Sequence, residues 1–133
     1  MIILDKKKIH LYQEKGVVFL HNIINKYWLD KLKLGIKKNF LNPSKYKCVY
    51  EKLDNNELFY DDYCNWQKIS EYKDFLFNSG IAKIASQLMK SNKVNLFHEH
   101  VLIKEPGSKK RTPWHQDQSY YCVEGKQNIS FWI

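Results

Sequence analysis

Arginine is almost absent from this 133-residue chain, which contains one, Arg111, among 22 basic residues. The other basic residues are lysines scattered between acidic residues, and together they give a formal net charge of +8. The planar guanidinium group of arginine binds phosphates and base edges, and a groove that binds nucleic acid contains a cluster of basic residues. We therefore interpret the charge as a solvated surface and expect no specific nucleic-acid partner.

Cysteine is scarce, and its spacing suits neither disulfide pairing nor zinc binding. Cys48, Cys64 and Cys122 are odd in number and none belongs to a CxxC pair. This predicts neither a disulfide framework nor a zinc knuckle, and we interpret the three cysteines as reduced, structural thiols. Long apolar runs are missing as well, since stretches such as residues 17–20 are far too short to cross a bilayer. The N-terminus lacks the features of a signal peptide, so we expect a cytoplasmic protein without a membrane partner.

Several common catalytic patterns are also missing. The five glycines are dispersed and form neither GxGxxG nor GxxxxGK[ST], the loops that cradle phosphates. Neither a Ser-His-Asp arrangement nor an acid–base pair of carboxylates is recognisable. Hydrophobic residues nevertheless make up 44% and aromatic residues 15% of the chain. That composition is sufficient to bury a core, and we expect residues 1–133 to form one domain.

The N-terminal part of the chain has the spacing of amphipathic helices. Apolar residues recur at intervals of three and four, and Gly16, Asn42-Pro43 and Ser79-Gly80 are typical helix-ending signals. The β-branched and aromatic run VVFL indicates a short buried strand. The predicted elements are, in order, helix 6–16, strand 17–20, helix 21–44 and two helices over residues 71–92.

The C-terminal third changes to the alternating pattern of strands. Residues 93–107 alternate up to Pro106-Gly107, residues 113–123 form a second extended segment, and residues 128–133 begin a third strand. Residues 45–65 are polar and weakly patterned, which indicates a loop. Helices followed by consecutive strands predict an α+β fold, whose open sheet edges offer a route to association.

The segment TPWHQDQSYY carries the strongest candidate for chemistry. Alternate residues of a strand share one face, so His115 and Asp117 are predicted to lie side by side while Gln116 points away. An imidazole and a carboxylate are two of the three ligands in the facial triad of non-haem Fe(II) enzymes. The alternative is an ordinary hydrogen-bonded pair on the surface, since an H-x-D tripeptide also arises by chance.

A second possible group of metal ligands lies in the segment FHEHVLIK. His98 and His100 are predicted to share one strand face with Lys104. Two histidines can bind zinc, but a third ligand of suitable spacing is missing and a lysine on the same face disfavours a cation. We interpret these histidines as surface residues or as residues behind a site. His10 and His21 are isolated and are interpreted as structural.

The sequence resembles the phytanoyl-CoA dioxygenase family along nearly its whole length. The resemblance is strongest in FHEHVLIKEPGSKKRTPWHQDQSYYCVEGKQNISFWI, where K-E-P-G is followed by P-W-H-Q-D-Q and a tyrosine. YQEKGVVFLHNIIN, KNFLNPS and DDYCNWQKI are also similar to family segments.

The resemblance implies a non-haem Fe(II) enzyme that uses 2-oxoglutarate and molecular oxygen to hydroxylate a small-molecule substrate. It implies a double-stranded β-helix, or cupin-like jelly roll, with helices packed outside it. His115 and Asp117 would be iron ligands, and Lys68, Val101 and Trp132 would line the 2-oxoglutarate pocket. For these last three, an exposed lysine, a core valine and a core tryptophan are equally good interpretations.

The sequence departs from the family in two respects. The family has a second histidine ligand and a 2-oxoglutarate-clamping arginine downstream, but no histidine follows His115 and no arginine follows Arg111. We therefore expect residues 1–133 to be the N-terminal portion of the jelly-roll domain, truncated before the distal iron ligand and inactive alone. The alternative is a non-catalytic fragment or interaction module of the same fold. The identity of the substrate cannot be derived from these residues.

Overall fold

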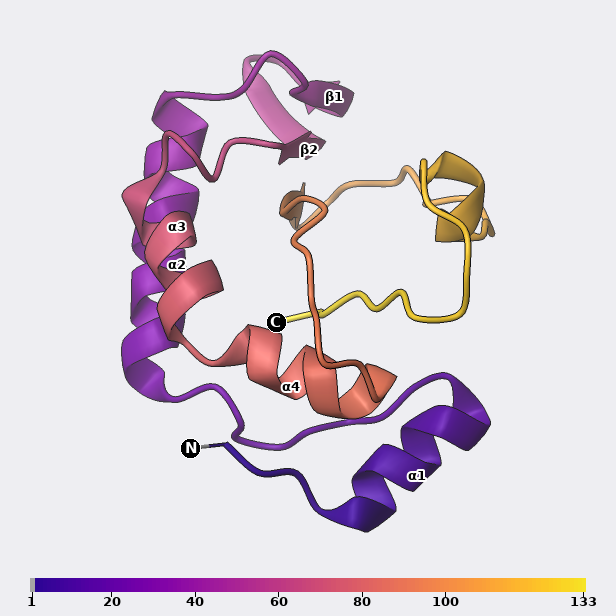
Figure 1. Ribbon diagram of the computed structural model, residues 1–133. Coiled ribbons are helices and arrows are strands. Elements are labelled where there is room, and N and C mark those ends of the chain that lie inside the picture. Colours follow the sequence, from indigo (N-terminus) through magenta and orange to yellow (C-terminus); the bar gives the residue numbers. More distant parts are fainter. Residues whose placement is uncertain (1) are drawn as a thin grey trace.

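A computed structural model describes residues 2–133 (Figure 1). Within them, four α-helices accompany a three-stranded antiparallel sheet and one short 3-10 helix, so the α+β prediction is confirmed. The elements are, in chain order, α1 (Lys6–Lys15), α2 (Lys26–Leu41), β1 (Cys48–Leu53), β2 (Asn56–Tyr63), α3 (Ser70–Asn78), α4 (Ile81–Met89), β3 (His100–Lys104) and η1 (Asp117–Tyr120).

The helices begin and end at local signals. The side chain of Asp5 caps α1 by accepting the N–H of Lys7 at 2.9 Å, and Gly16 ends the helix in the left-handed region at φ 72°. Asn25 caps α2 in the same way, and Pro43 follows its C-terminal end. The predicted break between α3 and α4 is confirmed at Gly80, whose φ is 86°. No helix in residues 2–133 is long and apolar enough to span a membrane.

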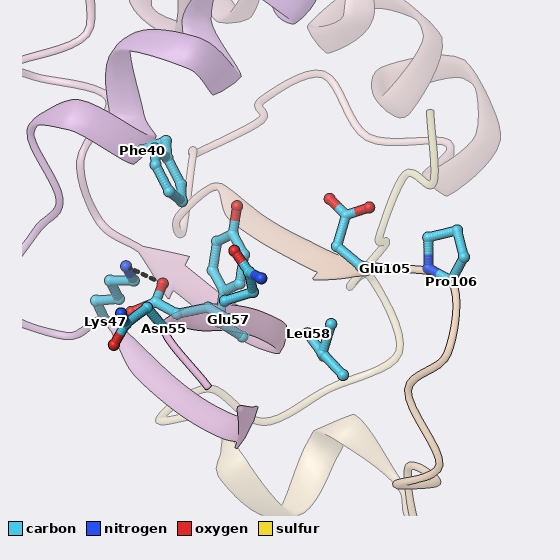
Figure 2. A pocket seen from close by; sticks show the side chains of 9 residues that line it. Phe40, Lys47, Asn55, Glu57, Leu58, Glu105 and Pro106 are labelled. Atoms are coloured by element: carbon cyan, nitrogen blue, oxygen red, sulfur yellow. Dashed lines mark hydrogen bonds and ion pairs between the residues drawn. The ribbon is translucent and has the colours of Figure 1, made fainter. Parts of the chain in front are cut away.

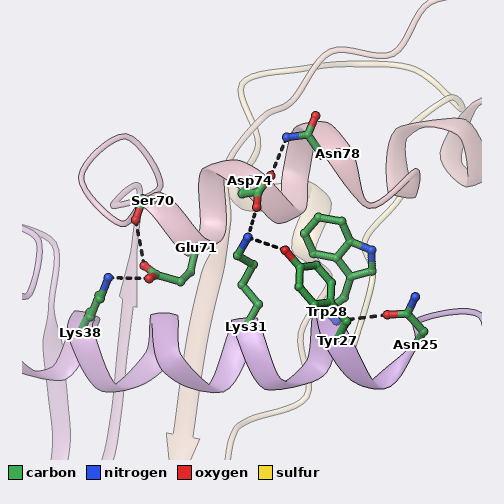
Figure 3. A network of polar contacts seen from close by, with 9 residues as sticks. All are labelled: Asn25, Tyr27, Trp28, Lys31, Lys38, Ser70, Glu71, Asp74 and Asn78. Atoms are coloured by element: carbon green, nitrogen blue, oxygen red, sulfur yellow. Dashed lines mark hydrogen bonds and ion pairs between the residues drawn. The ribbon is translucent and has the colours of Figure 1, made fainter.

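Helices α2 and α3 lie side by side and pack closely (Figure 1). Gly35 permits this approach, because a Cβ atom at that position would lie 2.5 Å from Cε1 of Tyr72. The buried Tyr72 ring therefore occupies the space that a side chain on α2 would need. Two ion pairs join the helices (Figure 3): Lys31 with Asp74, and Lys38 with Glu71.

The hydrophobic core lies where the helices meet. Its centre is a cluster of buried side chains from the N-terminal segment, α3 and α4: Leu4, Phe75, Ile81, Ile84 and Leu88. Half-buried residues from α1, α2 and the C-terminal segment cover this cluster, among them Ile9, Trp28 and Phe131. The core thus draws on both ends of the chain.

A buried polar network attaches the sheet to α2. Asp62 of β2 is 1% exposed, and its carboxylate accepts hydrogen bonds from the side-chain amide of Asn39, the N–H and hydroxyl of Ser44, and the N–H of Tyr63. Asn65 extends the network by donating to Asn39 Oδ1 at 2.9 Å. A buried carboxylate is tolerated only when hydrogen bonds replace its hydration, and this network provides four.

The sheet is built differently from the prediction. Residues 45–65, expected to be a loop, form the β1–β2 hairpin, closed by Asp54 and Asn55 between the paired residues Leu53 and Asn56. Asp54 has φ 53°, a left-handed conformation that aspartate tolerates. β2 is the central strand and buries four consecutive residues, Phe59 to Asp62. Consecutive burial, which includes two carboxylates, conceals the alternation that usually reveals a strand.

Several predicted strands are wrong or shorter than expected. Residues 17–20 form no strand, and Val17 and Phe19 are exposed. Of residues 93–107, only His100–Lys104 form a strand, which pairs with β2. Residues 113–123 contain the 3-10 helix η1, and residues 128–133 form no strand. The expected order of helices before strands is also wrong, because the hairpin lies between α2 and α3.

We predict that Asp62→Ala destabilises the protein by about 3 kcal/mol or more, since it leaves several buried donors without an acceptor. Urea denaturation monitored by circular dichroism measures the free energy of unfolding. Glu124→Ala, at an exposed loop position, is the control and should change that free energy little. A loss at Asp62 no larger than that of the control would contradict the structural role of the network.

Candidate metal centre

The segment that leads to His115 is held by a carboxylate from the opposite edge of the sheet. Glu51 of β1 accepts the hydroxyl of Ser108 at 2.5 Å and the backbone N–H groups of Lys109 at 3.0 Å and Lys110 at 2.9 Å. These donors, Ser108 foremost, lower the pKa of Glu51 to about 2. The loop after Pro106 is thus attached to the hairpin before the chain reaches the candidate ligands.

His115 and Asp117 are brought together, although not by a strand. His115 lies in irregular backbone and Asp117 begins η1. The ring nitrogen Nε2 of His115 nevertheless lies 3.1 Å from Oδ1 of Asp117, and both side chains are about half exposed. The predicted pairing therefore exists, and a turn into a 3-10 helix produces it in place of the alternation of a strand.

The backbone orients the imidazole ring of His115. Its Nδ1 atom lies 2.8 Å from the carbonyl oxygen of Pro113. A carbonyl oxygen only accepts, so Nδ1 carries the hydrogen and donates it. Nε2 is then the ring nitrogen that faces the carboxylate of Asp117. Either a proton on Nε2 or a cation can bridge the two atoms.

The spacing of this pair fits a divalent metal ion. Adjacent ligands of an octahedral ion lie about 3 Å apart when each bond is about 2.1 Å long, close to the 3.1 Å between Nε2 and Oδ1. Imidazole and carboxylate also match the donor preference of Fe(II). The hydroxyl of Tyr121 lies 3.5 Å from Oδ2 of Asp117 and can steady its second oxygen. The donor set and its geometry therefore fit two sites of an iron centre.

The remaining ligands are not assembled within the part of the chain that the structure describes. Residues 2–133 contain no group of three or more histidine, cysteine, aspartate or glutamate side chains placed to hold a metal. The aromatic neighbours do not enclose the two residues. The ring of His115 meets Tyr120 edge-on at 6.2 Å, but Trp114 is fully exposed and does not form a wall.

The other predicted site residues lie on separate segments. Lys68 is exposed in the turn between β2 and α3, and its N–H bonds to the carbonyl oxygen of Asn65. Val101 is half-buried on β3, opposite Asp62 of β2. Trp132 is 89% exposed, so it is not a core tryptophan in this structure. The assignment of these three residues to a 2-oxoglutarate pocket stays a prediction.

A second polar cluster, which the sequence did not reveal, surrounds Asp61. Its Oδ2 atom accepts the hydroxyl of Tyr50 at 2.8 Å and lies 3.0 Å from Nε2 of His100, while Oδ1 is buried without a partner among the described residues. Burial, followed by the bond to Asp61, raises the pKa of Tyr50. His98 lies before β3, and its ring centroid is 6.4 Å from that of His100. Nothing in the local sequence YDDY, residues 60–63, distinguishes Asp61 from Asp62, the carboxylate of the buried network.

Comparison with known proteins gives one match. The family model described as Phytanoyl-CoA dioxygenase (PhyH) matches residues 12–133. No curated protein and no solved structure matches the chain. The match spans both candidate ligands, the turn that carries Lys68 and the strand that carries Val101.

We predict that the attachment of the loop to Glu51 persists to strongly acidic pH. A carboxyl whose pKa is lowered by folding makes its stabilising contribution above its ordinary pKa, here 4.5, and loses it as the pH falls towards about 2. NMR should show the amide signals of Lys109 and Lys110 titrating near the lower value. Signals from β2 report any global acid unfolding separately.

Glu51→Gln supplies the control for this titration. The substitution should remove the inflection and shift both amide signals already at neutral pH, because a neutral amide is a weaker acceptor than a carboxylate. An inflection near 4.5 in the unsubstituted chain would show that the loop is not held by Glu51 in solution.

Proposed function

Because the chain belongs to the phytanoyl-CoA dioxygenase family, we propose that it is a non-haem Fe(II)/2-oxoglutarate-dependent dioxygenase that hydroxylates a small-molecule substrate. The observation that carries this proposal is the 3.1 Å contact between Nε2 of His115 and Oδ1 of Asp117. The separation of the two atoms suits adjacent positions around one octahedral ion. When bound, Fe(II) with 2-oxoglutarate and oxygen would supply the oxidising chemistry.

The residues of the chain itself provide binding and orientation in this proposal. His115 contributes Nε2, with its ring fixed by the Pro113 carbonyl, and Asp117 contributes Oδ1, with its backbone fixed by η1. The ammonium of Lys68 would neutralise one carboxylate of 2-oxoglutarate. Val101 and Trp132 would provide apolar walls for the same cosubstrate. The family pattern is what supports the last three roles.

We further propose that the β1–β2–β3 sheet belongs to a double-stranded β-helix. β3 pairs with β2 on one side, and its other side carries no strand among residues 2–133. Residues 1–133 would then be the N-terminal portion of such a domain. A metal at His115 and Asp117 would take further ligands that residues 2–133 do not place beside them, so the chain alone is proposed to be inactive.

A second candidate function is a non-catalytic interaction module of the same fold. Two observations favour it: the site contains two ligands, and the side of β3 that lies opposite β2 has no partner strand within the described residues. An unpaired strand edge can accept another strand, which would provide association without catalysis. Metal binding distinguishes the two candidates.

We predict that the 133-residue chain binds Co(II), a redox-stable substitute for Fe(II), through His115 and Asp117. Paramagnetic NMR shifts should be largest for the His115 ring protons next to Nε2 and for Asp117. His115→Ala and Asp117→Ala should each weaken binding roughly tenfold or more, because a two-ligand site has little affinity to spare. His10→Ala is the matched control, since His10 lies on α1 and should not contribute.

The same samples test catalysis by the release of carbon dioxide from 2-oxoglutarate in the presence of Fe(II). We expect no release from the chain alone. The metal centre would be rejected if His115→Ala and Asp117→Ala bound Co(II) as tightly as the unsubstituted chain. The interaction module would then be the remaining candidate function. Turnover that survives both substitutions would equally contradict the assigned ligands.

A further inference from the structure

One face of the sheet carries a pair of histidines that the proposed dioxygenase does not use. Tyr60 lines the groove of about 520 Å³ between the C-terminal end of α2 and the β1–β2 hairpin (Figure 2), so its neighbour Asp61 points to the opposite face of the sheet. On that face Asp61 contacts His100, and the ring of His98 lies beside that of His100, with centroids 6.4 Å apart. The ring of Tyr63 packs against both, at 5.8 Å from His98 and 5.6 Å from His100. This face therefore presents two neighbouring imidazoles on an aromatic support.

Hydrogen bonds determine which nitrogen of each ring carries the hydrogen. Nδ1 of His98 lies 3.2 Å from the carbonyl oxygen of Glu99, and Nε2 of His100 lies 3.0 Å from Oδ2 of Asp61. Both oxygens accept, so these two nitrogens donate. In the neutral rings, Nε2 of His98 and Nδ1 of His100 then carry lone pairs, and neither atom has a hydrogen-bond partner within residues 2–133. Each ring thus has one nitrogen that orients it and one that is free to bind a ligand.

Histidines that bind metals are held in the same way. A metal-binding histidine almost always donates from its other nitrogen to a carboxylate or a backbone carbonyl. His100 has the carboxylate and His98 has the carbonyl. Imidazole nitrogens suit borderline divalent ions such as Zn(II). Two rings that share such an ion have centroids about 5 Å apart when the metal–nitrogen bonds are about 2.1 Å long. Rotation of the side chains that closes the 6.4 Å separation by about 1 Å would let both rings bind one ion.

The local charge favours a cation at this pair. Asp61 is 6% exposed, and its only ion-pair partner among residues 2–133 is His100, so no lysine or arginine neutralises it. Its Oδ1 atom is buried and has no hydrogen-bond partner among the described residues. A cation on Nδ1 of His100 would make the Nε2–H group a stronger donor and would thereby compensate the carboxylate through the ring.

Lys104 shares this face of the sheet but lies at the other end of β3. It is four residues from His100, which is about 13 Å along a strand and beyond the distance over which salt screens exposed charges. Its ammonium donates to the carbonyl oxygen of Lys110 at 2.6 Å and lies 5.3 Å from the ring centroid of Phe59. Contrary to the expectation from the sequence, Lys104 therefore does not exclude a cation at the two histidines.

We propose that His98 and His100 together bind one borderline divalent metal ion, Zn(II), through Nε2 of His98 and Nδ1 of His100. Residues 2–133 place no third histidine, cysteine, aspartate or glutamate ligand beside them, so water would complete the coordination. The side chain of His100 is 44% exposed, which leaves the site open to ions in solution. The site is separate from His115 and Asp117, and its occupation does not depend on the proposed dioxygenase function.

The test is an NMR titration of the 133-residue chain with Zn(II), in which the ring nitrogens of all five histidines are followed. Before metal is added, His98 should carry its hydrogen on Nδ1 and His100 on Nε2. Zn(II) should then shift Nε2 of His98 and Nδ1 of His100 together and to saturation. Asp117→Ala should leave these shifts unchanged, which separates this site from the candidate metal centre. Zn(II) that shifts only one of the two rings, or neither, would overturn the proposal.

Two substitutions remove the proposed ligand atoms while keeping the orienting hydrogen bonds. His98→Asn retains a donor in the position of Nδ1, and His100→Gln retains one in the position of Nε2, so both variants should fold. Each should weaken Zn(II) binding at least about tenfold, because the remaining imidazole cannot chelate the ion alone. His10→Asn and His21→Gln, at exposed positions, are the matched controls and should leave the affinity unchanged. Unchanged Zn(II) affinity in His98→Asn or His100→Gln, with the amide spectrum preserved, would reject the site.

Discussion

The carboxylate of Asp62 is the constraint on which the arrangement of the other elements depends. A charged group that is 1% exposed must replace its hydration with hydrogen bonds, and those bonds come from α2, from the loop after it and from β2 itself. Meeting this requirement places the hairpin at the C-terminal end of α2. The groove of about 520 Å³ between α2 and the hairpin follows from that placement.

The helices could be predicted from the sequence because their signals are local. Asp5 and Gly16 delimit α1, and Gly80 separates α3 from α4, each within a few residues of the element that it ends. The hairpin was not predicted because two adjacent aspartates are typical of an exposed segment, whereas Asp61 and Asp62 are buried and contact the distant side chains of His100 and Asn39. Strands at residues 17–20 and 128–133 were predicted from composition, but a strand also needs a neighbour with which to form hydrogen bonds.

The candidate metal centre could also be predicted only in part from the sequence. The sequence correctly paired His115 with Asp117, because two residues that close in the chain can meet in more than one backbone conformation. The predicted strand conformation was wrong, because η1 and the hydrogen bond to the Pro113 carbonyl set the geometry of the pair. The cluster of Asp61, Tyr50 and His100 was beyond sequence reasoning, because it joins three strands whose pairing had not been predicted.

The attachment of Glu51 to residues 108–110 also limits how independently the candidate site can fluctuate. These hydrogen bonds break whenever the loop moves away, and they break equally when the β1–β2 hairpin opens and carries Glu51 with it. The protection of the Lys109 and Lys110 amides against hydrogen exchange therefore cannot exceed the free energy that opens the hairpin. Opening of the β1–β2 hairpin therefore sets an upper limit on how stably the segment before His115 is held.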